Sequence, residues 1–75
     1  MDYLQINRII KAEYQSKLIL VDVSISKFQQ EVISELLRND YTFNTMNTKA
    51  VISAASALFL KHLRIKKFKE IIKQS

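Results

Sequence analysis

The sequence predicts a mainly α-helical fold with one short β-strand. Apolar residues recur every three or four positions through most of the chain, as they do on one face of a helix. The last third, residues 48–74, contains neither Gly nor Pro and is long enough for a single extended helix. Residues 17–25 show a second pattern, because β-branched residues occupy alternate positions there.

The first predicted element is an N-terminal helix over residues 1–16. Asp2 and Gln5 have the spacing of a capping box, in which each side chain accepts from the other residue's backbone N–H. The apolar residues that follow fall largely on one side of a helix: Leu4, Ile6, Ile9, Ile10 and Tyr14. The polar side is mixed and indicates no particular chemistry.

The second element, residues 17–25, is predicted to be a short strand. Its β-branched residues alternate with the others: Ile19, Val21, Val23 and Ile25. The segment also keeps a helical spacing, since apolar residues recur at steps of three and four from Leu18 to Leu36. An all-α helical hairpin is therefore the alternative fold.

A helix over residues 27–38 follows, with Ser26 as the predicted N-cap and Gln29 three residues later. Its apolar stripe consists of Phe28, Val32, Ile33, Leu36 and Leu37. Glu31 and Glu35 lie one turn apart on the outer face, where we expect two solvated carboxylates and not a catalytic pair.

Residues 39–47 are predicted to form a loop, because Asn, Asp and Thr predominate and the first two tolerate a positive φ. Three larger side chains within it are expected to pack in the core or to contact a partner: Tyr41, Phe43 and Met46.

The final element is a long helix over residues 48–74, capped by Asn47 or Thr48. Small residues in its first half permit close helix packing. Its second half is basic, with one acid, Glu70, against six cationic side chains: Lys61, Arg64, Lys66, Lys67, Lys69 and Lys73.

The net charge of +5 is concentrated in the second half of the chain. Residues 1–40 hold five Lys or Arg and six acids, a net charge of −1, whereas residues 41–75 hold seven and one, a net charge of +6. This asymmetry indicates a polyanion or an acidic protein as the partner. The alternative is a solvated helix end whose Lys residues complement the helix dipole.

Seventy-five residues predict a single domain, with an N-terminal helix (1–16), a core (17–60) and a basic helical extension (61–75). A chain this short buries little surface, which makes the monomer only marginally stable, and we therefore expect a homodimer or a partner protein. Apolar runs are too short for a membrane span, and the absence of a signal peptide and of Cys makes the cytoplasm the expected compartment.

The sequence indicates neither a cofactor, nor a metal site, nor an enzyme. There is no Cys, and the single His62 has the spacing of a core residue among Leu58, Phe59 and Ile65. No Ser or Thr therefore has an assignable base, and the carboxylates lack the spacing of a metal site.

The run Thr48-Lys49-Ala50-Val51-Ile52-Ser53-Ala54-Ala55, with Phe59 one turn later, resembles the second helix of the ribbon-helix-helix regulators, the type represented by Arc, MetJ and CopG. The resemblance covers residues 17–60. It implies an intertwined dimer whose paired strands read bases in the major groove. By position, the outward readers would be Leu20, Asp22 and Ser24, although the first is apolar and the second would face phosphates. The N-terminus of the long helix, at Asn47, Thr48 and Lys49, would grip a phosphate.

Two functions follow. In the first, the chain is a small dimeric DNA-binding regulator that contacts phosphates through its basic helix and that helix N-terminus. In the second, it is a protein-interaction module, such as a small chaperone, an antitoxin-like neutraliser or a phage-encoded inhibitor, which binds a partner through amphipathic helices. A strand at residues 17–25 favours the first function, and a helix there favours the second. Binding to an anionic membrane is a third and weaker alternative.

Overall fold

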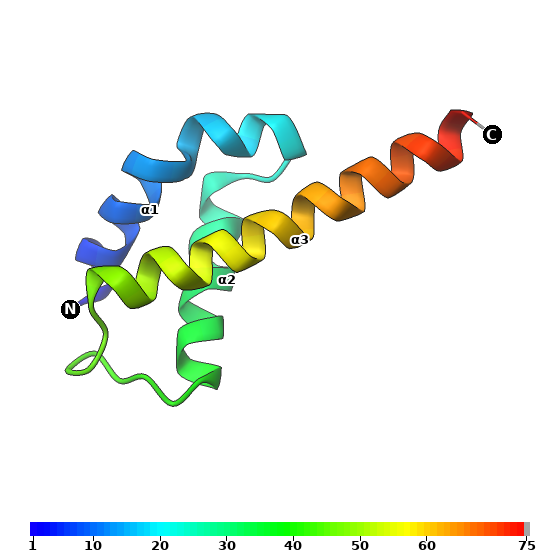
Figure 1. The fold of residues 1–75 in the computed structure, drawn as a ribbon. Coiled ribbons are helices and arrows are strands. Elements are labelled where there is room, and N and C mark those ends of the chain that lie inside the picture. Colours follow the sequence, from blue (N-terminus) through cyan, green and yellow to red (C-terminus); the bar gives the residue numbers. More distant parts are fainter. Residues whose placement is uncertain (75) are drawn as a thin grey trace.

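The structure is a computed structural model that describes residues 1–74 (Figure 1). In chain order its elements are α1 (Tyr3–Leu18), the 3-10 turn η1 (Ile19–Val21), α2 (Ile25–Arg38) and α3 (Thr48–Gln74). Residues 1–74 contain no strand, so the predicted strand over residues 17–25 is wrong, and so is the ribbon-helix-helix-like fold built on it. The all-α alternative is confirmed.

Residues 17–25 are the end of α1, η1, a short turn and the first residue of α2. Leu18 and Val21 are 2% and 6% exposed and lie in the same core as Phe28. Burial at helical spacing outweighs the β-propensity of the branched residues, which only matters where a strand can pair. No second strand exists within residues 1–74 to provide that pairing.

The two chain reversals are built on aspartates in the left-handed conformation, Asp22 (φ 56°) after η1 and Asp40 (φ 66°) after α2. At the second, the N–H of Asp40 donates to the carbonyl of Leu37 and the N–H of Tyr41 to that of Leu36. This paired arrangement is the Schellman motif, which usually carries Gly at the left-handed position. The expectation that an Asn or Asp of the 39–47 loop adopts a positive φ holds at Asp40.

The helix starts show one correct prediction and one wrong one. The capping box of Asp2 and Gln5 is confirmed, with both backbone-to-side-chain bonds present. The cap of α2 is Ser24, whose hydroxyl accepts from the N–H of Lys27 at 3.2 Å, and not Ser26. Gln29 takes no part in capping, because its side-chain amide donates to the carbonyl of Asn7 in α1.

The range predicted for the long helix is confirmed. Asn47 is its N-cap, since its side-chain oxygen accepts from the N–H of Ala50 at 2.9 Å. The N-terminal half of α3 packs against both α1 and α2, with Val51 and Ala55 fully buried. The small residues predicted to permit close helix packing, such as Ala50 and Ala55, are buried against the other helices of the same chain. A hydrogen bond of 2.7 Å also joins Ser56 to the hydroxyl of Tyr14 on α1.

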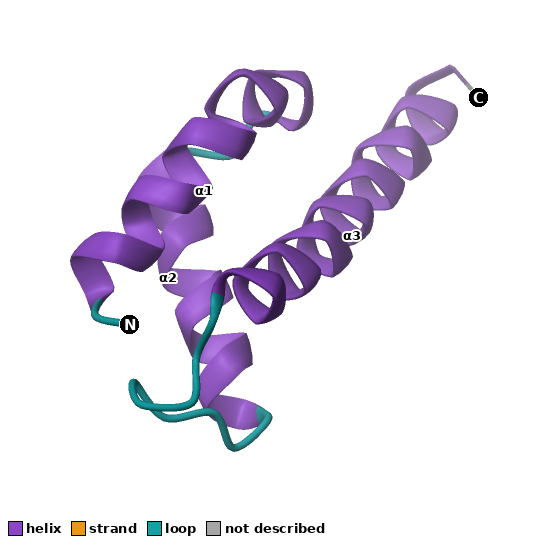
Figure 2. Ribbon diagram, turned by 60° about the vertical axis from the view of Figure 1, so that its left-hand side comes forward, coloured by secondary structure: helices purple, strands orange, loops and turns teal. Residues whose placement is uncertain are grey.

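The hydrophobic core lies where the three helices meet (Figure 2). Its buried members come from every element and include Met46 of the loop: Ile6, Ile10, Tyr14, Leu18, Val21, Phe28, Val32, Leu36, Met46, Ala50, Val51 and Ala55. The described chain measures 48 × 23 × 17 Å. Its long axis reflects α3, whose C-terminal part extends well past α1 and α2 (Figure 1).

Candidate partner-binding surface

The part of α3 beyond the core, residues 65–74, is here called the projecting segment (Figure 1). Leu63 still packs against the core. After it the large apolar side chains are exposed: Ile65 by 42%, Phe68 by 63%, Ile71 by 65% and Ile72 by 55%. Exposed apolar side chains that form a contiguous patch mark an interaction site, whereas isolated ones need no explanation.

Three of these side chains form a seam. Successive residues of a helix are ~100° apart, so Ile65, Phe68 and Ile72 fall on one side of α3. Their steps of three and four are those of the a and d positions of a coiled coil. We call these three residues the apolar stripe. The preceding positions of the same seam are Leu58 and Lys61.

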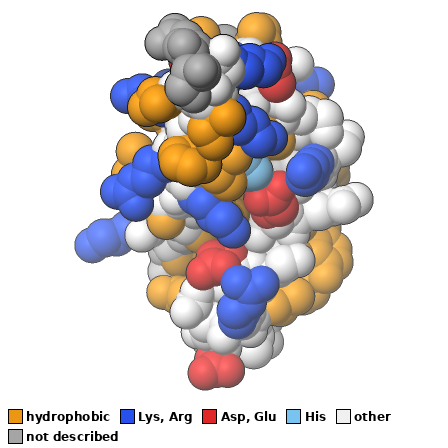
Figure 3. Space-filling model, turned by 90° about the vertical axis from the view of Figure 1, so that its right-hand side faces the viewer, with side chains coloured by type: hydrophobic (Ala, Val, Ile, Leu, Met, Phe, Trp, Pro, Cys, Tyr) orange, Lys and Arg blue, Asp and Glu red, His pale blue; other side chains and the backbone are white. Residues whose placement is uncertain are grey.

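Basic residues flank the apolar stripe on both sides. Lys69 lies on the side where Lys27 of α2 lines the same hollow, and Lys66 and Lys73 share its row on the helix. Arg64 lies on the opposite side of the stripe, and Ile71 lies on that same side two turns further along the helix. Figure 3 shows the resulting surface, in which hydrophobic side chains near the end of α3 are surrounded by Lys and Arg.

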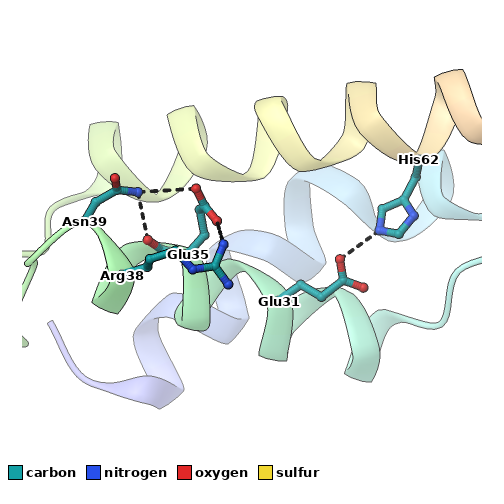
Figure 4. Close-up of polar contacts among 5 residues, drawn as sticks. All are labelled: Glu31, Glu35, Arg38, Asn39 and His62. Atoms are coloured by element: carbon teal, nitrogen blue, oxygen red, sulfur yellow. Dashed lines mark hydrogen bonds and ion pairs between the residues drawn. The ribbon is translucent and has the colours of Figure 1, made fainter.

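Two polar contacts hold α3 where it leaves the core. Nε2 of His62 lies 2.9 Å from Oε2 of Glu31 on α2, so the imidazole donates to the carboxylate (Figure 4). One turn further on, the ammonium group of Lys66 donates to the carbonyl of Leu20 and lies 3.5 Å from a carboxylate oxygen of Asp22. These contacts link α3 to both α2 and η1.

A hollow of about 340 Å³ opens beside the apolar stripe. Three of the residues lining it are lysines, Lys27 from α2 and Lys66 and Lys69 from α3. Its other lining residues are Val21, Asp22, Val23, His62 and Ile65. The lining thus carries three lysines against one carboxylate, together with three apolar side chains, of which Ile65 also belongs to the stripe.

No protein-family model, curated protein or solved structure matches this chain. Within residues 1–74, no helix has both the length and the apolarity needed to cross a membrane. Over the same residues, no three His, Cys, Asp or Glu side chains are grouped so that they could hold a metal ion.

The residues predicted to bind nucleic acid do not form one patch. Asn47, Thr48 and Lys49 lie at the start of α3, and the basic residues from Lys61 to Lys73 lie toward its other end. At 1.5 Å per residue, Lys49 and Lys67 are about 27 Å apart along the helix. Asn47 is already engaged as the N-cap.

The three predicted base readers lie in the turn between α1 and α2 and do not line a strand. Ser24 caps α2, and Asp22 pairs with Lys66. Leu20 is exposed, and its carbonyl accepts from the same lysine. The fold thus brings Leu20 and Asp22 to the base of the projecting segment, where they position α3 and offer no basic or amide group for reading bases.

Glu31 and Glu35 belong to separate contacts (Figure 4). Glu35 accepts from Arg38 at 2.8 Å and from Asn39, on the exposed end of α2. Glu31 is partly buried against His62, and its second carboxylate oxygen is buried without a partner among residues 1–74. The expectation of two solvated carboxylates therefore fails for Glu31, because α3 covers it.

Sequence reasoning missed two features of this surface. It treated residues 48–74 as one helix with small residues first and basic residues after, and did not show that the core ends before Phe68 and Ile72. The 3-4-3 spacing marks a seam but does not reveal how far a partner helix extends beside it. Sequence reasoning also gave no role to Lys27. Its position beside Lys69 depends on how α2 and α3 pack, which the local spacing of residues does not show.

Proposed function

We propose that the protein is a protein-interaction module whose projecting segment binds an amphipathic helix of a partner protein. The observation that carries the proposal is the apolar stripe of Ile65, Phe68 and Ile72, large side chains exposed at seam spacing on a helix that extends past its own core. Such a seam buries its apolar face when a second helix lies along it, with anchors at the same spacing.

A second copy of this chain is a poor occupant of the stripe. In a parallel pair of α3 helices, Arg64 of one copy would face Lys69 of the other. In an antiparallel pair, the same flank of each helix meets, so the row of Lys66, Lys69 and Lys73 would face that row of the other copy. Both arrangements place like charges across the seam, which favours a partner of different sequence. The homodimer expected from the chain length stays a prediction, and it would have to form through a surface other than the apolar stripe.

A membrane surface also fits less well than a helix. A helix that lies on a bilayer buries a wide and continuous apolar face, with its basic residues confined to the opposite side. Here Lys61 falls within the seam, and Arg64 separates the apolar stripe from Leu60 and Ile71. A narrow stripe between basic flanks matches the seam of a helix pair more closely.

A binding measurement with a synthetic helix tests the proposal. The probe is a fluorescent peptide of about three heptads with Leu at a and d and Glu at e and g. We expect it to bind the wild-type protein and to lose at least about tenfold in affinity for Phe68→Ser, since a buried aromatic anchor contributes more than 1.4 kcal/mol. Leu4→Ser, an equally exposed site on α1, is the matched control and should bind normally. Equal affinity for Phe68→Ser, or no binding to wild type, would overturn the proposal.

Duplex DNA binding is the second candidate function, favoured by the concentration of Lys and Arg toward the end of α3. It requires an affinity that falls steeply with salt, because each phosphate contact releases counterions. A gel-shift titration should then show weakening for a Lys69→Gln and Lys73→Gln double variant, with Phe68→Ser unaffected. Absence of a shift at low ionic strength would eliminate this candidate.

A further inference from the structure

We infer that the partner helix is acidic along the flank that faces α2, and that its carboxylates enter the hollow formed by Lys27, Lys66 and Lys69. The inference rests on the proposed function and specifies the chemistry of the partner. It depends on the position of the hollow, on the state of its three lysines and on the difference between the two flanks of the stripe.

The hollow and the apolar stripe form one continuous surface. Ile65 belongs to both, since it is the first residue of the stripe and also lines the hollow. Lys69 lies between the stripe residues Phe68 and Ile72 in sequence and also lines the hollow. A helix that covers the stripe therefore extends its near flank over the hollow.

The three lysines in the hollow differ in what they already bind. Lys66 is held by the carbonyl of Leu20 and by Asp22, so its ammonium group has a fixed place. Among residues 1–74, the side chains of Lys27 and Lys69 form no ion pair. Lys27 and Lys69 come from different helices and line one hollow, and the one carboxylate that lines it, that of Asp22, is paired with Lys66. An anion placed between the ammonium groups of Lys27 and Lys69 would attract both. A carboxylate is the anionic group that a partner helix carries.

The opposite flank of the stripe does not require carboxylates on the partner in the same way. There Arg64 is followed by Ile71, which is 65% exposed, so this side is partly apolar. A partner with carboxylates on the α2 side and a mixed flank on the other satisfies both. The surface thus favours one direction for the helix, since reversing the helix exchanges its flanks.

A charge-exchange experiment tests this inference. Three peptides share Leu at a and d and carry Glu, Gln or Lys at the flanking positions. They are titrated against the wild-type protein and against a Lys27→Glu and Lys69→Glu double variant. The control is Lys11→Glu with Lys49→Glu, which changes the net charge equally at exposed positions away from the stripe. Far-UV circular dichroism verifies that each variant is helical.

We expect the Glu peptide to bind wild type at least about fivefold more tightly than the Gln peptide, which corresponds to two ion pairs at the rim of an interface. The Lys27→Glu and Lys69→Glu variant should reverse this order and prefer the Lys peptide, whereas the control keeps the wild-type order. Glu and Gln peptides of equal affinity would overturn the acidic partner and leave the helix-binding proposal intact. If no peptide binds but vesicles of anionic lipid or duplex DNA do, both proposals are wrong.

Discussion

Glu31 on α2 and His62 on α3, thirty-one residues apart, are joined by a contact of 2.9 Å between a carboxylate oxygen and Nε2 of the imidazole. The pair lies where α3 leaves the core, and the ring of Phe28 lies 6.3 Å from that of His62. Because both side chains are partly buried, the contact is shielded from competing water. Together with the contacts of Lys66, it holds α3 in place where the projecting segment begins.

Replacing His62 with Ala should lower the free energy of unfolding by about 1–2 kcal/mol, because the Glu31 carboxylate then loses its hydrogen bond while partly buried. Lys67→Ala, an exposed site one and a half turns along α3, should change it by less than about 0.5 kcal/mol. Urea denaturation followed by circular dichroism measures both. Similar values for the two variants would show that the contact does not support the fold.

Substitutions at Phe28 and Phe68 should distinguish a residue that stabilises the fold from a residue that binds a partner. Phe28 is fully buried between the three helices, so Phe28→Ala should cost about 3–5 kcal/mol of unfolding free energy. Phe68 is mostly exposed, and Phe68→Ser should change stability by less than about 0.5 kcal/mol, since Ser and Phe have similar helix propensities. Thermal unfolding measures both. A large loss of stability for Phe68→Ser would show that its side chain belongs to the fold.

Tyr14 and Ser56 join α1 to α3 through a hydrogen bond of 2.7 Å. Tyr14→Phe and Ser56→Ala should each lower the unfolding free energy by about 1 kcal/mol. The double variant should cost less than the sum of the two, because the second substitution has no bond left to break. Strict additivity in this double-mutant cycle would mean that the bond contributes nothing to stability.

Asp40 holds the left-handed position at the end of α2, where a Cβ is unfavourable. Asp40→Gly should therefore be more stable than Asp40→Ala by about 1 kcal/mol, and the wild type should lie between them, since Asp tolerates this conformation better than Ala. The melting temperatures of the three proteins give the order. An Ala variant as stable as the Gly variant would show that this turn can adopt another conformation.

The elements that could be predicted are those whose evidence is local. The range 48–74 followed from an unbroken helical pattern behind a predicted cap at Asn47 or Thr48, and the start of α1 followed from the capping box of Asp2. A positive φ within residues 39–47 was also predictable, because Asn and Asp side chains tolerate that conformation.

The remaining features depend on tertiary packing. Residues 17–25 combine β-branched alternation with helical spacing, and only the core contact of Leu18 and Val21 decides between them. The hydrogen bond of Glu31 to His62 and the placing of Lys27 beside Lys69 both require the angle between α2 and α3. The spacing of residues within either helix does not determine that angle. The basic residues were recognised, but the neighbours that make them a surface were not.

The most direct test of helix binding at the projecting segment is an NMR titration of ¹⁵N-labelled protein with the Glu-flanked peptide. Binding along the apolar stripe predicts that the largest amide shift changes lie between Ile65 and Ile72, with a further change at Lys27 across the hollow. Changes concentrated on α1 or at Asn47 to Lys49, or no changes at peptide concentrations that saturate binding, would contradict the account.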